Sequence, residues 1–267
     1  MTRFSERITS RQNEIVARYL SAARGGESEW LLLDGEHLIS DAAAAGLTLS
    51  HVMVTSDPSG ARSVRHLLDR LSRDRVSVTE GSPSVMAAIS PVRSPSSVVA
   101  LAVRPPAASP FRSQPPLVVI ACDVQDPGNV GAMARVAEAA GASGLVAAGQ
   151  CANPFGWKAL RGSMGSALRL PIAIEPRRGE AIAEARRRGC RIVATVPRDA
   201  APMSGVNLGG PVALLIGGEG RGLGDELVEA ADQRITIPMR PPVESLNAAV
   251  TAAVVLYEIH RQRYFVV

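Results

Sequence analysis

The strongest constraint on the fold lies in the second half of the chain, where short apolar runs alternate with stretches of helical periodicity. The apolar runs occupy residues 117–124, 144–149, 191–196, 212–217 and 234–239. The helical stretches occupy residues 130–140, 179–188, 225–230 and 246–263. Strands that are apolar on both faces are typical of a parallel sheet covered by helices. We therefore predict an α/β domain built on a parallel sheet.

The first part of the chain repeats this alternation on a smaller scale and predicts a small α/β domain at residues 1–103. Its expected strands are residues 30–33, 51–55, 76–79 and 98–103. Its expected helices are residues 10–23, with Ser10 as a possible N-cap, 36–45 and 63–72. Residues 104–116 hold five prolines and predict an extended linker, which leaves residues 117–267 as the second domain.

Composition excludes several classes of protein. Hydrophobic residues make up 46% of the 267 residues and charged residues 20%, which is typical of a globular and not a disordered chain. The polar start and the lack of an apolar run of about 18 residues argue against a signal peptide and a membrane helix, so we expect a cytoplasmic protein. The three cysteines and four histidines are scattered, and their spacing predicts neither a disulfide framework nor a metal site.

The positive charge is carried almost wholly by arginine, since Lys158 is the only lysine and the formal net charge is +4. Two interpretations stay open: codon usage in a GC-rich genome, or guanidinium groups that bind phosphate. A nucleic-acid partner is permitted by this charge but not shown by it. Aromatic residues make up only 3% of the chain, which argues against a surface built mainly on base stacking.

Polar residues follow the first predicted strand of the second domain in the segment DVQDPGNVGAMAR, residues 123–135. Asn129 stands where it could cap the next helix. Arg135 is not needed for helix formation and could bind a phosphate or a substrate. On residue type alone, however, an arginine that extends to the surface is the better interpretation.

Five glycines crowd the segment LLIGGEGRGLGDEL, residues 214–227, at the end of another predicted strand. Glycine lets a ligand approach the backbone closely, and α/β proteins bind ligands at the carboxyl ends of parallel strands. Glu219 is either a catalytic carboxylate or a loop charge, and residue type alone favours the loop charge. A dinucleotide-binding fingerprint fits poorly, because no acidic strand end follows. The chain also lacks GxSxG and GxxxxGK[ST] motifs.

A third segment, residues 237–263, begins IPMRPPVESLNAAV and joins a strand end to a long apolar helix. Ser245 could cap this helix, and Asn247 would lie in its first turn. Core packing explains the apolar residues that follow. It does not explain why polar side chains flank Leu246, so a functional role for Ser245 stays open beside capping.

Together the three segments resemble the three motifs of the SpoU (TrmH-like) family, within the SPOUT class of RNA methyltransferases. NVGAMAR matches the first motif, LIGGEGRGL the second and IPMRPPVESLNAAV the third, in the same order. The resemblance covers residues 117–263. With lower specificity, LLLDGEHLISDA in the first domain resembles a small ribosomal-protein-like RNA-binding domain that often precedes the catalytic one.

The resemblance implies a deep trefoil knot in the carboxy-terminal domain, a feature that composition could never suggest. It also implies that the knotted loops bind S-adenosyl-L-methionine, with Gly217, Ile237 and Leu246 at the matching positions. The implied protein is a homodimer with its active site near the subunit interface. The implied reaction is attack of a ribose 2′-hydroxyl in RNA on the sulfonium methyl group.

By the same resemblance, Arg135 would act beside the 2′-hydroxyl and the adjacent phosphate. Because a guanidinium normally stays protonated, we expect Arg135 to stabilise charge and position the substrate and not to act as a base. Asn129 and Glu219 would orient Arg135 and the knotted loops. Ser245 and Asn247 would hold the phosphate and ribose of the substrate.

Some alternatives stay open at this point. Ribosomal RNA is the favoured substrate, because a separate first domain suits a large structured target, and transfer RNA is the second choice. A non-catalytic RNA-binding protein with the same fold, an antibiotic-resistance methyltransferase and, more distantly, a nucleotide-dependent oxidoreductase are further candidates. Pro241 and Pro242 stand where the family often has glycine, so the local loop can differ.

Overall fold

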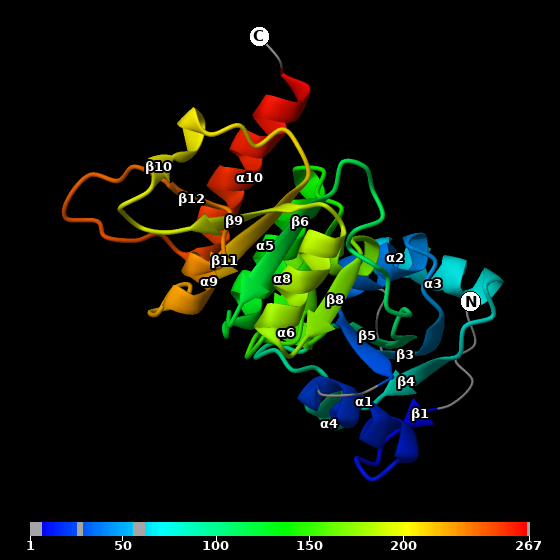
Figure 1. The fold of residues 1–267 in the computed structure, drawn as a ribbon. Coiled ribbons are helices and arrows are strands. Elements are labelled where there is room, and N and C mark those ends of the chain that lie inside the picture. Colours follow the sequence, from blue (N-terminus) through cyan, green and yellow to red (C-terminus); the bar gives the residue numbers. More distant parts are fainter. Residues whose placement is uncertain (1–6, 26–28, 56–61, 266–267) are drawn as a thin grey trace. The chain divides into compact units, whose positions relative to one another are not determined.

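The computed structural model describes residues 7–25, 29–55 and 62–265, and its chain divides into two units. The first unit consists of Met1–Pro106 and Phe155–Leu168, and the second of Ala107–Pro154 and Arg169–Val267. Each unit has its own sheet (Figure 1). The segment Phe155–Leu168 thus belongs to the first unit, although its sequence lies within the range predicted for the second domain.

A seven-stranded parallel sheet forms the centre of the second unit, in the order β10-β12-β9-β11-β6-β7-β8. The strands are β6 (Leu117–Cys122), β7 (Gly144–Ala148), β8 (Ile172–Glu175), β9 (Arg191–Thr195), β10 (Ala201–Pro202), β11 (Val212–Gly217) and β12 (Gln233–Thr236). All five predicted strands and the parallel sheet are confirmed. The sequence prediction missed β8 and β10, because these edge strands are short and lack a run of buried apolar residues.

Helices cover both faces of this sheet, as the apolar strands predicted (Figure 1). The helices are α5 (Pro127–Ala139), α8 (Arg178–Arg187), α9 (Asp225–Glu229) and α10 (Ala248–Tyr264), with a 3-10 turn at Met203–Gly205. α8 and α9 contribute to one core cluster, which includes Ile120, Ile182 and Leu227. α5 and α10 pack against each other and against strands of the same sheet.

Two helix caps predicted for the second unit were wrong. Asp126, not Asn129, is the N-cap of α5, and its side chain accepts a hydrogen bond from Gly128 N at 2.6 Å. Pro127 then occupies the first helical position, where its fixed φ and missing N–H are tolerated, so Asn129 lies in the first turn. Asn247, not Ser245, caps α10, because its Oδ1 accepts from the N–H groups of Ala249 and Val250.

The first unit is a small α/β unit on a mixed five-stranded sheet in the order β1-β4-β3-β5-β2, which confirms the prediction for this part of the chain. Its strands are β1 (Arg7–Ile8), β2 (Trp30–Asp34), β3 (Leu49–Thr55), β4 (Val78–Gly81) and β5 (Val98–Val103). Its helices are α1 (Glu14–Arg24), α2 (Glu36–Ala44), α3 (Arg62–Arg73), α4 (Pro83–Ile89) and α6 (Trp157–Ser163), and α7 (Ser166–Arg169) follows. The cap of α1 is Asn13 and not Ser10, and β1, α4, α6 and α7 were not predicted.

Residues 104–116 contain no helix or strand, but they are not a free spacer. The Phe111 side chain is 6% exposed and belongs to the core of the second unit. Pro110 lies so close to Gly144 that a Cβ added to that glycine would overlap it. Among the described residues, no helix combines the length and the apolar character needed to cross a membrane.

A buried polar network crosses the core of the first unit. Tyr19 Oη lies 2.9 Å from His51 Nδ1, and Thr79 Oγ1 lies 3.1 Å from His51 Nε2. Burial lowers the pKa of His51 to about 4, and the positive charge of Arg18 acts in the same direction. The folded unit therefore holds His51 neutral at neutral pH.

This network predicts that the first unit loses stability in mild acid. In the unfolded chain His51 has a pKa near 6.5, so its contribution is complete above that pH and is lost as the pH falls toward 4. The free energy of unfolding should fall by up to about 3 kcal/mol. Urea unfolding followed by tryptophan fluorescence measures it, because both tryptophans, Trp30 and Trp157, pack against the core of this unit. The free energy of unfolding of a His51→Gln variant should change less with pH between 6.5 and 4.5. A dependence on pH as steep as that of the wild type would contradict the prediction.

Candidate active site

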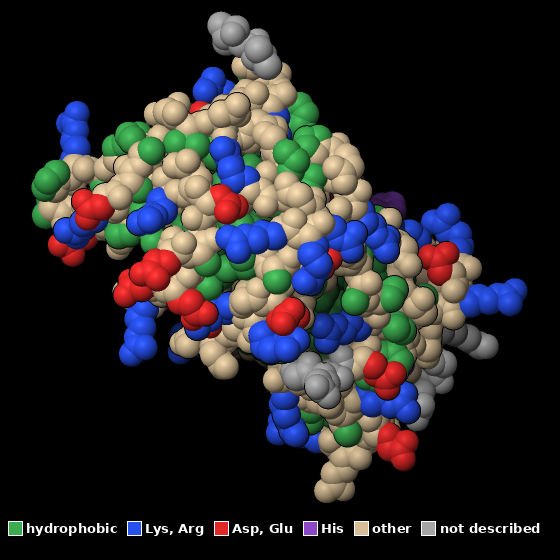
Figure 2. All heavy atoms as spheres, in the orientation of Figure 1, with side chains coloured by type: hydrophobic (Ala, Val, Ile, Leu, Met, Phe, Trp, Pro, Cys, Tyr) green, Lys and Arg blue, Asp and Glu red, His purple; other side chains and the backbone are tan. Residues whose placement is uncertain are grey.

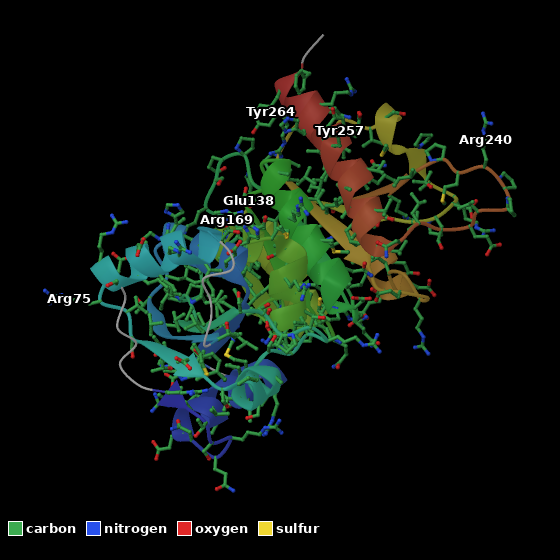
Figure 3. The ribbon with its side chains drawn as sticks, turned by 180° about the vertical axis from the view of Figure 1, so that it is seen from behind. Arg75, Glu138, Arg169, Arg240, Tyr257 and Tyr264 are labelled. Atoms are coloured by element: carbon green, nitrogen blue, oxygen red, sulfur yellow. The ribbon has the colours of Figure 1, made fainter. Side chains whose placement is uncertain are left out.

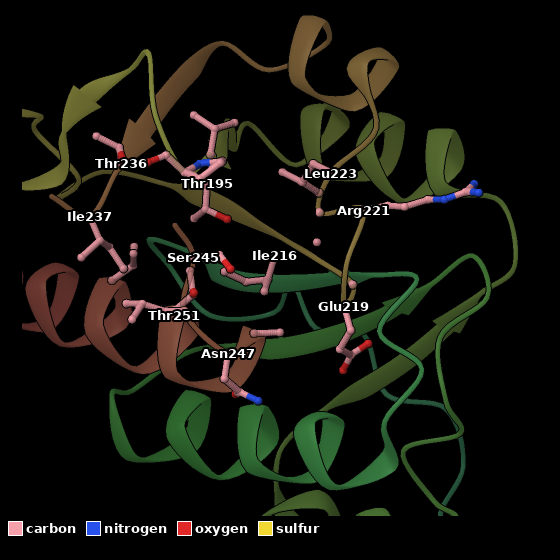
Figure 4. A pocket seen from close by; sticks show the side chains of 18 of the residues that line it. Thr195, Ile216, Glu219, Arg221, Leu223, Thr236, Ile237, Ser245, Asn247 and Thr251 are labelled. Atoms are coloured by element: carbon pink, nitrogen blue, oxygen red, sulfur yellow. Dashed lines mark hydrogen bonds between the residues drawn. The ribbon is translucent and has the colours of Figure 1, made fainter. Parts of the chain in front are cut away.

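A cavity of about 440 Å³ opens at the carboxyl ends of β12, β9 and β11, which are neighbours in the sheet (Figure 4). Its walls are the residues that follow these three strands and the start of α10. Six of the eight residues proposed from the sequence line it, namely Gly217, Glu219, Ile237, Ser245, Leu246 and Asn247. Parallel α/β proteins bind ligands at this edge of the sheet, so the position fits the prediction.

The glycine-rich loop after β11 returns on itself. Gly218 and Gly222 form an isolated bridge, and a Cβ added at Gly217 would overlap the backbone of Gly222 and Leu223. A Cβ at Gly218 would overlap the carbonyl of Asp123, at the end of β6. Gly220 and Gly222 have φ values of +82° and +64°, which other residues rarely adopt. The loop therefore needs glycine for close backbone approach at two positions and for its backbone conformation at two more.

Glu219 connects this loop to the start of α5. Its Oε2 accepts a hydrogen bond from Gln125 N at 3.0 Å, and its Oε1 accepts one from Asn129 Nδ2 at 2.6 Å. Partial burial acts to raise the pKa of Glu219, but the hydrogen bonds from Asn129 and from backbone N–H groups outweigh it and hold the pKa below its usual value. Glu219 is therefore ionised at neutral pH and accepts hydrogen bonds.

Asn247 extends the same network to the third segment. Its Nδ2 donates to Asn129 Oδ1 at 3.0 Å, while its Oδ1 caps α10. In Figure 4, the side chains of Glu219 and Asn247 both point from the pocket rim toward α5. The chain Glu219–Asn129–Asn247 thus ties together residues from all three sequence segments.

Arg135 lies outside this network. It occupies the exposed side of α5 and does not line the cavity. Within the described ranges, its guanidinium has no hydrogen bond or ion pair. Arg135 stands six positions after Asn129, which corresponds to about 9 Å along a helix axis and to a rotation of about 120° away from the same face. Arg135 is therefore free to meet a ligand at the protein surface.

Several residues of the site were not predicted. Thr195, Thr236 and Thr251 line the cavity, and the first two already donate hydrogen bonds to backbone carbonyls. Asp123, which has a φ of +56°, accepts from Gln150 N and from Arg178 Nη1, both at 2.7 Å. It thereby fixes the end of β6 against which Gly218 packs. The sequence signal for Asp123 was its place as the one charged residue in the otherwise apolar run 117–124.

No metal centre accompanies the cavity in the described part of the chain, where no three His, Cys, Asp or Glu side chains lie together in a suitable group. Arginine side chains are interspersed with carboxylates on the face drawn in Figure 2. Charge on that face therefore does not by itself identify a binding surface, and the cavity and its hydrogen-bond network are the better guide.

Comparison with known proteins gives this site its context. The SpoU rRNA Methylase family matches residues 116–257. The chain belongs to this family. A tRNA/rRNA methyltransferase of Synechocystis described as uncharacterised is 33% identical over 263 residues, 96% of this chain and 94% of that protein. The 23S rRNA (guanosine(2553)-2'-O)-methyltransferase RlmP of Bacillus subtilis is 28% identical over 85% of this chain and 87% of its own length.

A solved structure of this SpoU family extends the likeness to the first unit. The SpoU methyltransferase AviRb from Streptomyces viridochromogenes, in complex with AdoMet, is similar to this chain with a TM-score of 0.83 and 27% identity. The match covers 94% of this chain and 98% of that one. The SpoU resemblance inferred from the three motifs is therefore confirmed. The range matched by the family, residues 116–257, contains the residues that form the hydrogen-bond network around Glu219.

Proposed function

We propose that this chain uses S-adenosyl-L-methionine to methylate ribose 2′-hydroxyl groups in RNA, with ribosomal RNA as its substrate. The observation that carries the proposal is the network Glu219–Asn129–Asn247, which joins residues of all three sequence segments at the rim of one cavity. Relatives named as rRNA 2'-O-methyltransferases support the reaction class and the choice of RNA. A cytoplasmic location follows from such a substrate and is part of the proposal.

The cavity fits the proposed methyl donor. Its volume lies in the range of small-molecule sites, and apolar side chains such as Ile216, Ile235 and Leu223 line it beside exposed backbone of the glycine loop. Gly217, Ile237 and Leu246 would hold the adenosine and methionine parts through backbone groups. When bound, S-adenosyl-L-methionine supplies an electrophilic methyl group.

The residues at the rim would act on the RNA. Arg135 would stabilise the negative charge that develops on ribose O2′ and hold the adjacent phosphate, because its exposed guanidinium is free of partners in the described structure. Asn129 and Glu219 would fix the start of α5 against the glycine loop. Ser245 and Asn247 would contact the phosphate and ribose, and Ser245 is free for this role because Asn247 caps α10.

Two finer features of the fold belong to the proposal. The first is a trefoil knot formed by the loops after β11 and β12 with α10. It is supported by the way both loops and the start of α10 close around one cavity. The second is that the first unit binds the RNA substrate, which its α/β architecture and its presence in the match to AviRb support.

We further propose a homodimer that forms through α10. Val250, Tyr257 and Tyr264 recur at heptad spacing along this helix and are 46%, 71% and 62% exposed. Residues seven apart lie on one face of a helix, so the three side chains form an apolar stripe. Figure 3 shows both tyrosines projecting from α10. Large exposed apolar surface of this kind marks interaction sites.

Changing Tyr257 to glutamate should convert the dimer to a monomer, because a carboxylate would be buried without a partner in the middle of the stripe. Light scattering coupled to size exclusion measures the molar mass. Ile174→Glu is the matched control, since Ile174 is also exposed (46%) but lies on the edge strand β8. A wild-type protein that is monomeric at micromolar concentration would contradict the proposal.

Methyl transfer is tested by incubating the full chain with tritiated S-adenosyl-L-methionine and either ribosomal or transfer RNA from cells that lack the gene. We expect label in ribosomal RNA, at a single 2'-O-methyl site found by primer extension at low nucleotide concentration. Label in transfer RNA alone would overturn the substrate, and no label in either RNA would overturn the reaction. RNA binding without any binding of S-adenosylhomocysteine would instead indicate a non-catalytic RNA-binding protein.

A further inference from the structure

A second cavity, of about 430 Å³, lies wholly within the first unit. It opens at the carboxyl end of β2 and the start of α2, beside the residues that precede β5 and a turn after α6. Its lining includes the polar side chains of Asp34, Glu36, His37 and Arg161 and the apolar side chain of Met164. Its size suits a small ligand or a single nucleotide.

Two carboxylates of the lining, Asp34 and Glu36, differ in their hydrogen bonding. Asp34 is already occupied, because Ser90 Oγ donates to its Oδ2 at 2.6 Å and Ser96 Oγ donates to its Oδ1. Glu36 is the first residue of α2, and its side chain is 23% exposed. In the described part of the chain, its Oε2 is buried and accepts no hydrogen bond. A buried acceptor without a donor is costly, so Glu36 is the group that a ligand would satisfy.

The rest of the lining offers a cation and two exposed groups that could contact a flat ligand. Arg161 is exposed, and within the described residues its guanidinium has no partner. The His37 side chain is 86% exposed, with Nε2 only 3.7 Å from Glu36 Oε1. Met164, in a left-handed conformation after α6, is 52% exposed. A ligand with hydrogen-bond donors at one end, a flat apolar body and an anionic group would complement this lining.

We propose that this cavity binds one unstacked guanosine nucleotide of the RNA substrate, an inference that rests on the proposed function. An ionised carboxylate only accepts hydrogen bonds. Guanine is the one common base whose Watson–Crick edge presents two adjacent donors, N1–H and the N2 amino group. Adenine and cytosine each place an acceptor beside their amino group, and uracil flanks its single donor with two acceptors. Glu36 therefore selects guanine among the four bases.

The other side chains account for the rest of the nucleotide. Arg161 pairs with its phosphate, and His37 and Met164 cover a face of the base, as side chains do when they bind unstacked bases in single-stranded RNA. A basic peptide, the other ligand that acidic side chains would attract, is disfavoured by Arg161 in the same lining. The site would recognise a base near the methylated nucleotide without taking part in the reaction.

The test uses the full chain and fluorescein-labelled uridine decamers that carry one central guanosine, inosine or adenosine. Fluorescence anisotropy gives the three dissociation constants. The wild-type chain should bind the guanosine decamer about tenfold more tightly than the other two, because inosine lacks the N2 amino group and adenosine lacks both donors. Equal binding of the three decamers, or no binding of any, would overturn the proposal.

Glu36→Gln sharpens the test, because a carboxamide presents one acceptor and one donor and no longer matches the two adjacent donors of guanine. The variant should lose the preference for guanosine and bind the three decamers about equally. Glu180→Gln, at an exposed position of α8, is the matched control and should behave as wild type. Arg161→Gln should weaken all three complexes alike and reduce their salt dependence. A Glu36→Gln variant that still prefers guanosine would overturn the role of Glu36.

Methyl transfer to ribosomal RNA, measured on the same preparations, separates this inference from the proposed function. If the wild-type chain methylates RNA but shows no base preference in the decamers, the proposed function stands and the guanosine site is overturned. If the chain prefers guanosine but transfers no methyl group, the guanosine site stands and the proposed reaction is overturned.

Discussion

Replacing Arg135 with alanine is expected to lower the rate of methyl transfer about 100- to 1000-fold, which is the usual cost of removing one group that stabilises charge in a transition state. The affinity for S-adenosylhomocysteine should not change, because Arg135 does not line the cavity. The fold should not change either, since Arg135 is exposed and has no partner in the described structure. Single-turnover rates, calorimetry with S-adenosylhomocysteine and thermal unfolding measure these three quantities.

The control for Arg135 is Arg188→Ala. Arg188 is also exposed at the surface of the second unit, but it follows α8 and pairs with Glu184. This variant should retain the full rate of methyl transfer. Arg135→Lys should recover only part of the rate, because lysine keeps the charge but lacks the planar guanidinium that binds a phosphate through two hydrogen bonds. Full activity of Arg135→Ala would remove Arg135 from the reaction, and loss of S-adenosylhomocysteine binding would point to a structural role.

The sequence contained enough information to predict the sheet of the second unit. Strands such as β6 and β11 are buried along almost their whole length, so their sequences are apolar without alternation, which indicates a parallel sheet. Because all parallel strands end at one edge, the polar residues after β6, β11 and β12 could be expected to meet there. The hydrogen bonds from Asn129 to Glu219 and from Asn247 to Asn129 show that they do.

The caps could have been predicted better than they were. In the sequence Asp126-Pro127-Gly128-Asn129, proline favours the first helical position, and this points to Asp126 as the cap. No such signal separates Ser245 from Asn247, because both residue types cap helices and they stand only two residues apart.

Long-range contacts explain what the sequence could not reveal. Residues 155–168 lie between strands of the second unit but belong to the first, where Trp157 packs against a core formed by Tyr19, Leu32 and Met53. Nothing local in the segment indicates its partner. The second cavity depends on this segment, because its residues Arg161 and Met164 line the cavity together with Asp34 and Glu36. A division of the sequence at the proline-rich segment alone would therefore separate parts of one site.

Gly217→Ala is expected to reduce the affinity for S-adenosylhomocysteine by about 10- to 100-fold, because overpacking costs about 1–3 kcal/mol and each 1.4 kcal/mol is about tenfold in affinity. The added methyl group would overlap the backbone of Gly222 and Leu223, and no rotation of a side chain can relieve that overlap. The glycine loop would have to open at the point where its two ends meet. This displacement should also destabilise the second unit by about 1–3 kcal/mol, as overpacking does in protein cores.

Gly224→Ala makes the same chemical change in the same loop and serves as the control. Gly224 has a φ of −63°, and nothing lies within 4 Å of the position of an added Cβ, so this variant should bind S-adenosylhomocysteine like the wild type. Calorimetry gives the affinities, and urea unfolding gives the stabilities. If Gly217→Ala bound S-adenosylhomocysteine as tightly as Gly224→Ala, the close approach of the loop ends would not shape the cavity. The assignment of the cavity to S-adenosyl-L-methionine would then lose its main structural support. If neither variant bound S-adenosylhomocysteine, any substitution in the loop would abolish binding, and Gly217 would have no special role.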